Sequence, residues 1–351
     1  MSDQTQRILV IRRRYLGDIV LLGIFLHNLR LHWPRCIIHV LVEESYAGIL
    51  PLNPDVERVH RLPRKGWAVN QSLSLLRDLR STGFTHVFDF DNTEKTALLT
   101  RITGAPFRAV LNISGRKLRF PGCYTRCETV SQAFRGSQHI TAYNNCLLGT
   151  IGAPIVDVPL ELHPLAKDRD WATSLPAIAA LPANRPRLLI HPGSRSAFRI
   201  WPAKNFATVC DQLQREGLAS VTLIAGPAEQ TTVNEIQSLM VTPATVIAEQ
   251  VPIARLAALF QCFNLFLCHD SGPMHLATSV GLPVVALFSS QNINEWRPLG
   301  AGNIALQPPL PCVNCVAPGV CKPDDSYHNY CVRNITTDQV LSAIRERLTR
   351  V

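Results

Sequence analysis

The sequence predicts an α/β protein with two Rossmann-like, doubly wound domains that face a central cleft. Short β-rich runs alternate with helical patterns along most of the chain, which is typical of parallel sheets covered by helices. The alternation stops in a proline-rich stretch near the middle of the chain and then begins again. With 351 residues, the chain is long enough to form two separate cores.

The first domain is predicted to span residues 1–163. After its first strand, a helix is expected to run through about Trp33, where Pro34 stops it. The other helices are expected near Gln71–Ser81 and Lys95–Thr103. The predicted strands are Arg7–Ile11, Cys36–Val42, Val56–Leu62, Thr85–Phe90 and Phe107–Leu111.

Residues 164–186 are predicted as a linker with one possible helix, because they are rich in proline and alanine and show little periodicity. A second domain, 187–333, and a C-terminal helix within 334–351 follow. The strands expected there are Arg187–His191, Ser220–Ala225, Asn264–Cys268 and Pro283–Phe288, with a further short strand before Glu249. The helices expected there are Ala203–Glu216, Glu229–Met240, Ile253–Cys262, His275–Val280 and Thr337–Leu348.

Composition narrows the class of protein. Residues 1–165 carry 20 Lys and Arg against 13 Asp and Glu, whereas the remainder carries 15 against 13. This surplus favours an anionic partner, but the basic residues are scattered and no nucleic-acid-binding motif accompanies them. The apolar run Ile19–Leu26 is shorter than the roughly 20 residues of a membrane span, and no secretory signal is visible. A cytoplasmic protein is expected, with its 11 cysteines as thiols or metal ligands.

The most informative motif, Asp270 to Ala277, follows an apolar strand and opens a helix. Ser271 and Gly272 would expose backbone N–H groups at the helix N-terminus, which favours an anion. Asp270 would lie at the strand end, where open α/β sheets bind ligands. A nucleotide is therefore the first hypothesis. A tight turn with an Asp cap is the alternative.

A second motif, Leu16-Gly17-Asp18, follows the first strand. Gly17 would allow close approach of a ligand to the backbone, and Asp18 would lie at the cleft end of the sheet. A carboxylate there suits a general base that deprotonates a substrate hydroxyl. The alternative is a helix N-cap, and one Asp can serve both roles.

Three further turns suit a nucleotide. After the strand ending at His191, Ser194 offers a hydroxyl, and Arg195 and Arg199 offer charge-assisted hydrogen bonds to a diphosphate. Gly226 would let the backbone approach a base or ribose. Glu249 would accept from ribose hydroxyls, or else be an ordinary surface residue. The dinucleotide fingerprint of three spaced glycines is missing here, which argues against a dehydrogenase.

Two patterns raise the question of a metal. The spacing of Cys312, Cys315, Cys321 and Cys331, with His328 as a possible substitute, matches structural zinc sites, but buried or free thiols are the default. Asp89-Phe90-Asp91 matches an Asp-x-Asp metal-binding motif that belongs to a different fold. In this context its carboxylates are expected to cap or to face the cleft instead.

Taken together and in this order, the motifs resemble those of the bacterial lipopolysaccharide heptosyltransferases, family 9 of the glycosyltransferases. The resemblance covers nearly the whole chain. It rests on Leu16-Gly17-Asp18, His191-Pro192-Gly193-Ser194, Arg199-Ile200-Trp201-Pro202, Ala225-Gly226-Pro227 and Asp270 to Ala277. It implies the GT-B fold, and a heptose transferred from ADP-heptose to the inner core of lipopolysaccharide. It also implies inversion at the anomeric centre with neither metal nor cofactor.

The resemblance also implies a role for each site residue, with acceptor binding in the first domain and donor binding in the second. Asp18 would be the catalytic base. The donor diphosphate would contact Ser194, Arg195, Arg199, Ser271, Gly272, Pro273, Met274 and His275. The donor sugar or ribose would contact Asp270, Glu249 and Gly226. The acceptor would contact Arg14, Gly17, Arg61, Arg64, Lys65, Arg116 and Lys117, with Arg119 a further candidate.

The partners implied are ADP-heptose and a lipid A-Kdo or partial core acceptor, with no nucleic acid. The protein would lie peripherally on the cytoplasmic face of the inner membrane, where a basic first domain suits an anionic lipid-linked saccharide. Three alternatives remain: a same-fold transferase for another nucleotide sugar, a sugar-nucleotide epimerase, and a non-enzymatic nucleotide-sugar or lipid-binding protein.

Overall fold

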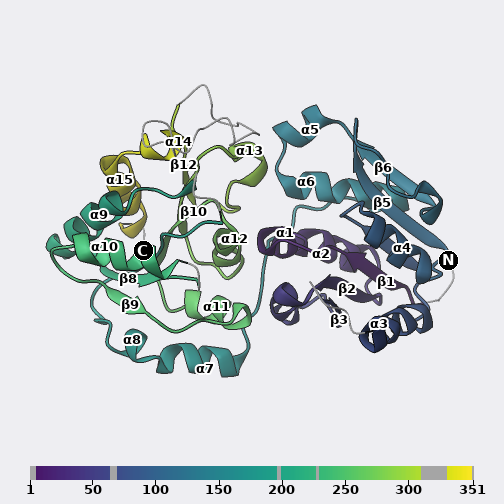
Figure 1. Ribbon diagram of the computed structural model, residues 1–351, viewed down its shortest axis with the longest axis horizontal. Helices are drawn as coiled ribbons and strands as arrows, with labels where there is room; N and C mark the ends of the chain where they lie inside the picture. The colour runs from purple at the N-terminus through teal and green to yellow at the C-terminus, as the bar shows by residue number, and fades with distance from the viewer. Residues whose placement is uncertain (1–4, 64–68, 196–198, 227–228, 310–329, 350–351) are drawn as a thin grey trace. The chain divides into compact units, whose positions relative to one another are not determined.

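The computed structural model describes residues 5–63, 69–195, 199–226, 229–309 and 330–349 (Figure 1). The chain divides into two compact units, Met1–His163 and Pro164–Val351. Each unit holds one parallel six-stranded sheet. Within the described residues, no helix has the length and hydrophobicity needed to cross a membrane.

Unit 1 is a doubly wound sheet with helices packed on it. Its strands are β1 (Arg7–Ile11), β2 (Ile37–Glu43), β3 (Arg58–Leu62), β4 (His86–Asp89), β5 (Phe107–Ile113) and β6 (Arg126–Val130). Its α-helices are α1 (Leu16–Leu21), α2 (Gly23–His32), α3 (Val69–Ser81), α4 (Glu94–Ile102), α5 (Gln132–Ser137) and α6 (Ile140–Asn145). Its 3₁₀ helices are η1 (Glu44–Leu52), η2 (Pro121–Cys123) and η3 (Cys146–Ile151).

Unit 2 repeats this plan. Its strands are β7 (Arg187–His191), β8 (Ser220–Ile224), β9 (Thr245–Ile247), β10 (Leu265–His269), β11 (Val284–Leu287) and β12 (Ile304–Leu306). Its first helices are α7 (Ala166–Ser174), α8 (Pro176–Ala179), α9 (Ala203–Arg215), α10 (Gln230–Leu239) and α11 (Ile253–Phe260). The remaining helices are α12 (Gly272–Ser279), α13 (Ile293–Trp296), α14 (Tyr330–Arg333) and α15 (Thr337–Leu348).

The two sheets share one topology. Unit 1 has the strand order β3-β2-β1-β4-β5-β6, and unit 2 has β12-β11-β10-β7-β8-β9, which is the same order counted from the opposite edge. In each sheet the first and fourth strands are neighbours, with Ile11 opposite Asp89 in unit 1 and His191 opposite Cys268 in unit 2. Strand order reverses between these two strands, and this switch point is where such sheets bind ligands.

Apolar strand residues hold each sheet to its helices. In unit 1, Leu9, Ile11 and Val87 pack with Leu79 of α3 and Leu99 of α4. In unit 2, residues of β7, β8, β10 and β11 pack with α9, α10 and α15 in one larger core. The C-terminal helix is thus part of the second unit's core, and Trp201 donates its indole N–H to the carbonyl of Ile335 at 2.8 Å.

The structure differs from the sequence expectations at several elements. The helix expected through Trp33 is divided at Leu22, which keeps helical dihedral angles. The edge strand β6 was not predicted, because only Val130 at its end is buried and the strand carries no apolar pattern. Residues expected as a linker form α7 and α8 within unit 2, where Arg255 of α11 contacts Asp168 of α7 at 3.2 Å.

Candidate active site

The carboxylate of Asp18 lies in the first turn of α1, next to the switch point of unit 1. Its Oδ2 accepts the backbone N–H of Tyr15 at 3.0 Å. Tyr15 is the N-cap of α1, so Asp18 is the third helical residue and not the N-cap that the sequence offered as an alternative. Its Oδ1 accepts from the guanidinium of Arg12. Gly17 is buried in the same turn. The carboxylate is therefore fixed by one backbone and one side-chain donor, with 12% of the side chain exposed.

Two arginines link this turn to the loop after β4. Arg12 donates to the carbonyl of Phe90 at 3.0 Å and lies 3.6 Å from Asp91 Oδ1. Arg13 donates to Asp91 Oδ2 from its backbone N–H at 3.0 Å and from Nε at 2.9 Å. Burial acts to lower the pKa of Arg12, but the charges of Asp18 and Asp91 raise it overall, which keeps the guanidinium charged.

Asp89, the last residue of β4, holds this loop through a hydrogen bond from the backbone of Asp91. It is fully buried and accepts the hydroxyl of Tyr124 at 2.6 Å and the backbone N–H of Asp91 at 2.9 Å. Burial, followed by repulsion from Asp91, raises its pKa to about 6. Asp89 thus holds the loop, and Asp91 holds the two arginines. Among the described residues, no cluster of three potential metal ligands occurs.

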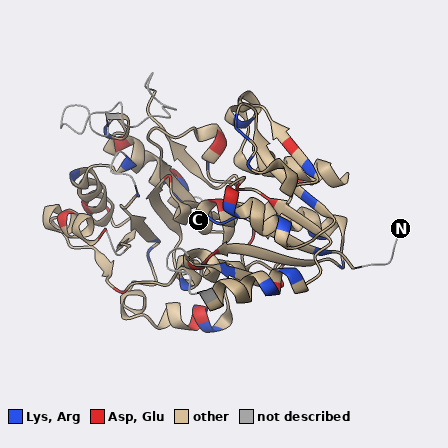
Figure 2. Cartoon of the chain, turned by 45° about the vertical axis from the view of Figure 1, so that its right-hand side comes forward, with Lys and Arg blue, Asp and Glu red and all other residues tan. Residues whose placement is uncertain are grey.

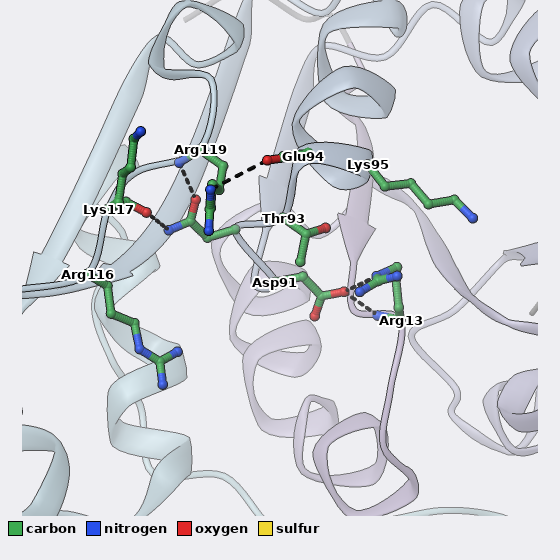
Figure 3. A pocket seen from close by; sticks show the side chains of 9 residues that line it. Arg13, Asp91, Thr93, Glu94, Lys95, Arg116, Lys117 and Arg119 are labelled. Carbon is green, nitrogen blue, oxygen red and sulfur yellow. Dashed lines mark hydrogen bonds and ion pairs between the residues drawn. The ribbon is translucent and has the colours of Figure 1, made fainter.

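A pocket of about 570 Å³ opens beside Asp91, within unit 1 (Figure 3). It is lined by the loops after β1, β4 and β5 and by the first turn of α4. The lining residues are Arg13, Asp91, Asn92, Thr93, Glu94, Lys95, Arg116, Lys117 and Arg119. The structure therefore brings the predicted acceptor residues Arg116, Lys117 and Arg119 together with two cations, Arg13 and Lys95, that were not assigned to the acceptor.

Among the described residues, the predicted acceptor residues Arg14 and Arg61 do not line this pocket. Arg14 is exposed, and its guanidinium lies 5.3 Å from the centre of the Tyr15 ring. Arg61 forms an exposed ion pair with Glu44 at 3.0 Å, a kind of contact that contributes little stability. Arg64 and Lys65 lie outside the described residues. Figure 2 shows the basic residues dispersed among acidic ones, so the pocket is a local concentration of charge.

In unit 2 a buried histidine joins the two switch-point loops. His269, the last residue of β10, accepts the backbone N–H of Trp201 at its Nε2, 2.8 Å away. Its Nδ1 lies 3.2 Å from the carbonyl oxygen of Gly193, to which it donates in the matching neutral tautomer. Burial lowers its pKa to about 3, so the ring is neutral at physiological pH. Sequence reasoning gave His269 no role, although a polar residue in an all-buried strand was a signal.

Asp270 directly follows this histidine and contacts Arg199, a residue that the sequence predicted to bind the diphosphate. Its Oδ2 accepts from the guanidinium of Arg199 at 3.2 Å. Burial raises the pKa of Asp270 to about 6 even though Arg199 and Arg195 act to lower it. Arg195 is exposed, and Ser194 is partly buried in the same loop. The predicted donor residues Arg199 and Asp270 are therefore adjacent, while Arg195 acts on Asp270 through its charge.

The N-terminus of α12 carries the other predicted diphosphate residues. Ser271 is the N-cap, and within the described part of the chain its buried Oγ has no hydrogen-bond partner. Gly272 and Pro273 form the first turn. The side chains of Met274 and His275 are 0% and 2% exposed. These two residues pack inside the unit, so any contact with a diphosphate at this turn would use the backbone and Ser271.

Glu229 is a second residue that the motifs missed. Its carboxylate contacts His191 Nε2 at 2.7 Å and accepts the backbone N–H of Gly226 at 2.7 Å. Burial acts to raise the pKa of Glu229, but the contacts with His191 and Gly226 lower it overall. A Cβ atom at Gly193 would lie 1.9 Å from this carboxyl group, which explains the glycine. The backbone N–H of Gly226, a residue predicted to contact the donor sugar or ribose, is thus already hydrogen-bonded to Glu229.

The remaining predictions concern Glu249 and the cysteines. Glu249 is exposed two residues after β9. Cys312, Cys315, Cys321 and His328 lie outside the described residues, whereas Cys331 is buried in the core of unit 2. None of the eight cysteines within the described ranges forms a disulfide.

Comparison with known proteins identifies the class. Residues 72–320 match the model of glycosyltransferase family 9 (heptosyltransferase). The chain belongs to this family and is a glycosyltransferase, and the predicted GT-B type of fold, with two Rossmann-like domains, is confirmed.

Individual relatives agree with this assignment. The chain is 27% identical over 292 residues to lipopolysaccharide heptosyltransferase 3 of Escherichia coli K12, covering 81% of this chain and 83% of that protein. A family 9 glycosyltransferase from Veillonella parvula is similar in structure, with a TM-score of 0.86, 23% identity, and coverage of 100% and 99% of the two chains. E. coli ADP-heptose lipopolysaccharide heptosyltransferase II has a TM-score of 0.79 at 19% identity, covering 98% and 99%.

Proposed function

We propose that this glycosyltransferase moves a heptose from ADP-heptose to the inner core of lipopolysaccharide, with inversion and without a metal. The observation that carries the proposal is the fixed carboxylate of Asp18 at the switch point of unit 1, in a chain whose relatives are heptosyltransferases. In this role Asp18 is the general base, and the acceptor is a lipid A-Kdo or partial core saccharide.

The reaction is a single displacement. Asp18 accepts the proton of an acceptor hydroxyl as its oxygen attacks the anomeric carbon of the heptose. The bond from that carbon to the diphosphate oxygen breaks, and ADP leaves with the bonding electrons. Because the diphosphate is a good leaving group, fixed cations suffice to stabilise it, and no second catalytic carboxylate is needed.

Unit 2 supplies the donor side in this proposal. Arg199, held by Asp270, and the exposed Arg195 offer positive charge to the diphosphate, with Ser194 beside them. Ser271, whose hydroxyl has no hydrogen-bond partner among the described residues, offers this hydroxyl at the N-terminus of α12, together with the amide of Gly272. The exposed Glu249 is free to accept from the ribose hydroxyls.

The acceptor side belongs to unit 1, whose basic residues suit an anionic lipid-linked saccharide. On this proposal the protein works peripherally at the cytoplasmic face of the inner membrane, where such an acceptor is exposed. Unit 1 carries the surplus of positive charge that attraction to that surface needs.

The test combines nucleotide binding with turnover. Calorimetric titration with ADP, UDP and GDP should give the tightest binding for ADP. Incubation with ADP-heptose and a core acceptor in the presence of EDTA should yield a heptosylated product with inverted anomeric configuration by NMR. Far tighter binding of UDP would indicate another nucleotide sugar, and conversion of the donor without acceptor would indicate an epimerase. Either result would overturn the proposal.

A further inference from the structure

The pocket beside Asp91 in unit 1 carries more positive charge than its own acids can neutralise. Five of the nine lining residues are Lys or Arg and two are acidic. The loops after three different strands supply these cations, so their grouping comes from the fold and not from a run of sequence. Figure 3 shows Arg116 on one side of the pocket and the Arg13–Asp91 pair on the other.

Both acids of the pocket are already paired. Asp91 accepts from Arg13 at 2.9 Å, and Glu94 pairs with the guanidinium of Arg119 at 3.4 Å. Among the described residues, neither Arg116 nor Lys117 has an ion-pair partner for its side chain. The Arg116 and Lys117 charges are therefore left for a ligand.

The lowered pKa of Lys95 is consistent with an excess of positive charge in the pocket. Burial lowers the pKa of Lys95, and the nearby charge of Arg13 lowers it further. Such repulsion between cations is relieved when an anion enters. The long side chains of Lys95 and Lys117 extend away from the centre of the view in Figure 3, and flexible ammonium groups of this kind can turn toward a bound anion.

We propose that this pocket binds a phosphoryl group in its dianionic form, together with part of the sugar that carries it. A dianion matches a surplus of three positive charges better than a single carboxylate does, and an arginine fork suits phosphate oxygens. The volume of about 570 Å³ exceeds what a phosphate alone occupies, which leaves room for the sugar. That the phosphoryl group belongs to the acceptor saccharide rests on the proposed function.

The pocket is also connected to the candidate base. Asp91 forms its wall and contacts both Arg13, at 2.9 Å, and Arg12, at 3.6 Å, and Arg12 contacts Asp18. A phosphoryl group bound here is therefore separated from the base by a short chain of ion pairs. The acceptor this site selects is one whose phosphorylated position lies near its reacting hydroxyl.

The first experiment measures binding of inorganic phosphate to the full chain by calorimetry, with saturating ADP so that phosphate does not report on the nucleotide site. At pH 8, where phosphate is mostly the dianion, we expect saturable binding. The double variant Arg116→Ala/Lys117→Ala should bind phosphate at least tenfold more weakly, with ADP affinity unchanged. Arg77→Ala, an exposed arginine on α3, is the matched control and should bind as the parent protein does.

Three outcomes would overturn the proposal. The first is phosphate affinity that is equal in the double variant and the parent. The second is acetate competing as well as phosphate, which would show a site for any anion. The third is binding to phosphatidylglycerol vesicles, but not to soluble phosphate, that depends on Arg116 and Lys117, which would make this a membrane-docking surface.

A kinetic measurement assigns the source of the phosphoryl group. If the acceptor carries it, enzymatic dephosphorylation of the acceptor should raise KM at least tenfold in the parent protein and leave KM unchanged in the double variant. Equal KM values for both acceptors in the parent would overturn the acceptor assignment. Phosphate binding can be measured without turnover. Failure of the heptosyltransferase proposal would therefore leave phosphate binding intact, whereas failure of the present proposal would abolish the dependence of phosphate binding on Arg116 and Lys117.

Discussion

Asp18 of unit 1 and Asp270 of unit 2 lie at the switch points of two sheets with the same topology, and each contacts one arginine. Their side chains are similarly covered, with 12% and 9% exposed. Their surroundings nevertheless differ. Around Asp18 the loops are held by ion pairs that include Arg12, Arg13 and Asp91. Around Asp270 they are held by the neutral ring of His269, and burial raises the pKa of Asp270 to about 6.

The difference shows how one topology supports two kinds of site. In unit 1 a network of charges holds in place the carboxylate that is proposed as the base. A neutral, fully hydrogen-bonded histidine fixes loop geometry without adding charge where an anionic diphosphate is proposed to bind. The following predictions test this contrast, from the largest expected effect to the smallest.

Asp18→Asn should show most clearly that the turns of Asp18 and Asp270 have different functions, because it should impair catalysis without affecting nucleotide binding. The amide keeps the shape of the side chain but cannot accept a proton, so kcat should fall by about 10²–10⁴-fold. The affinity for ADP, measured by calorimetry, should stay nearly unchanged, because the nucleotide is assigned to unit 2. Retained turnover would show that Asp18 is not the base.

His269→Ala should destabilise the chain. It leaves the N–H of Trp201 and the carbonyl of Gly193 without their partner in a buried site, and it also creates a cavity. We expect a loss of about 2–4 kcal/mol in the free energy of unfolding, measured with denaturant. His163→Ala, at an exposed position, is the control and should change little. A small effect of His269→Ala on stability would contradict the idea that the neutral ring of His269 holds the loops around Asp270.

Asp270→Asn should change the pH dependence of stability. The folded pKa of about 6 lies above the ordinary value of 3.8 for an aspartate, so between these pH values the folded protein holds a proton that the unfolded chain releases. This contribution therefore falls as pH rises through the window. The variant should equal the parent in stability near pH 4 and exceed it by about 3 kcal/mol above pH 6. Denaturant unfolding at both pH values measures the difference, and a constant difference would contradict the raised pKa.

Asp91→Asn should have the smallest effect. It removes the charge that orients Arg12 and Arg13 but leaves the base in place. We expect kcat to fall about tenfold, equivalent to about 1.4 kcal/mol, with ADP affinity unchanged. Asp157→Asn, at an exposed position of unit 1, is the control. If Asp91→Glu, which keeps the charge, lowered kcat as much as the asparagine variant does, loss of the charge would not be the cause.

Much of the fold was predictable from local patterns. The bounds of β1, β7 and α15 match the expected Arg7–Ile11, Arg187–His191 and Thr337–Leu348, because apolar periodicity and turn residues define such elements locally. The edge strand β6 was missed because exposed polar residues carry no such signal. The candidate site divides in the same way. Asp18, Arg199 and Asp270 were predicted as site residues because glycine-containing turns mark strand ends, whereas His269 and Glu229 were given no role in the site.

The sequence by itself determined the order of most strands and helices, the two-domain plan and the motifs at the strand ends, because these depend on residues close together in the chain. Only the tertiary structure decided which charges meet. Arg13 and Asp91 are 78 residues apart, and Gly193 and His269 are 76 apart. Parallel pairing of the first and fourth strands brings each of these pairs into contact. Hydrogen bonds and ion pairs act over a few ångströms, so residues far apart in the sequence can form them only after the sheet has brought them together. Local sequence patterns therefore do not predict them.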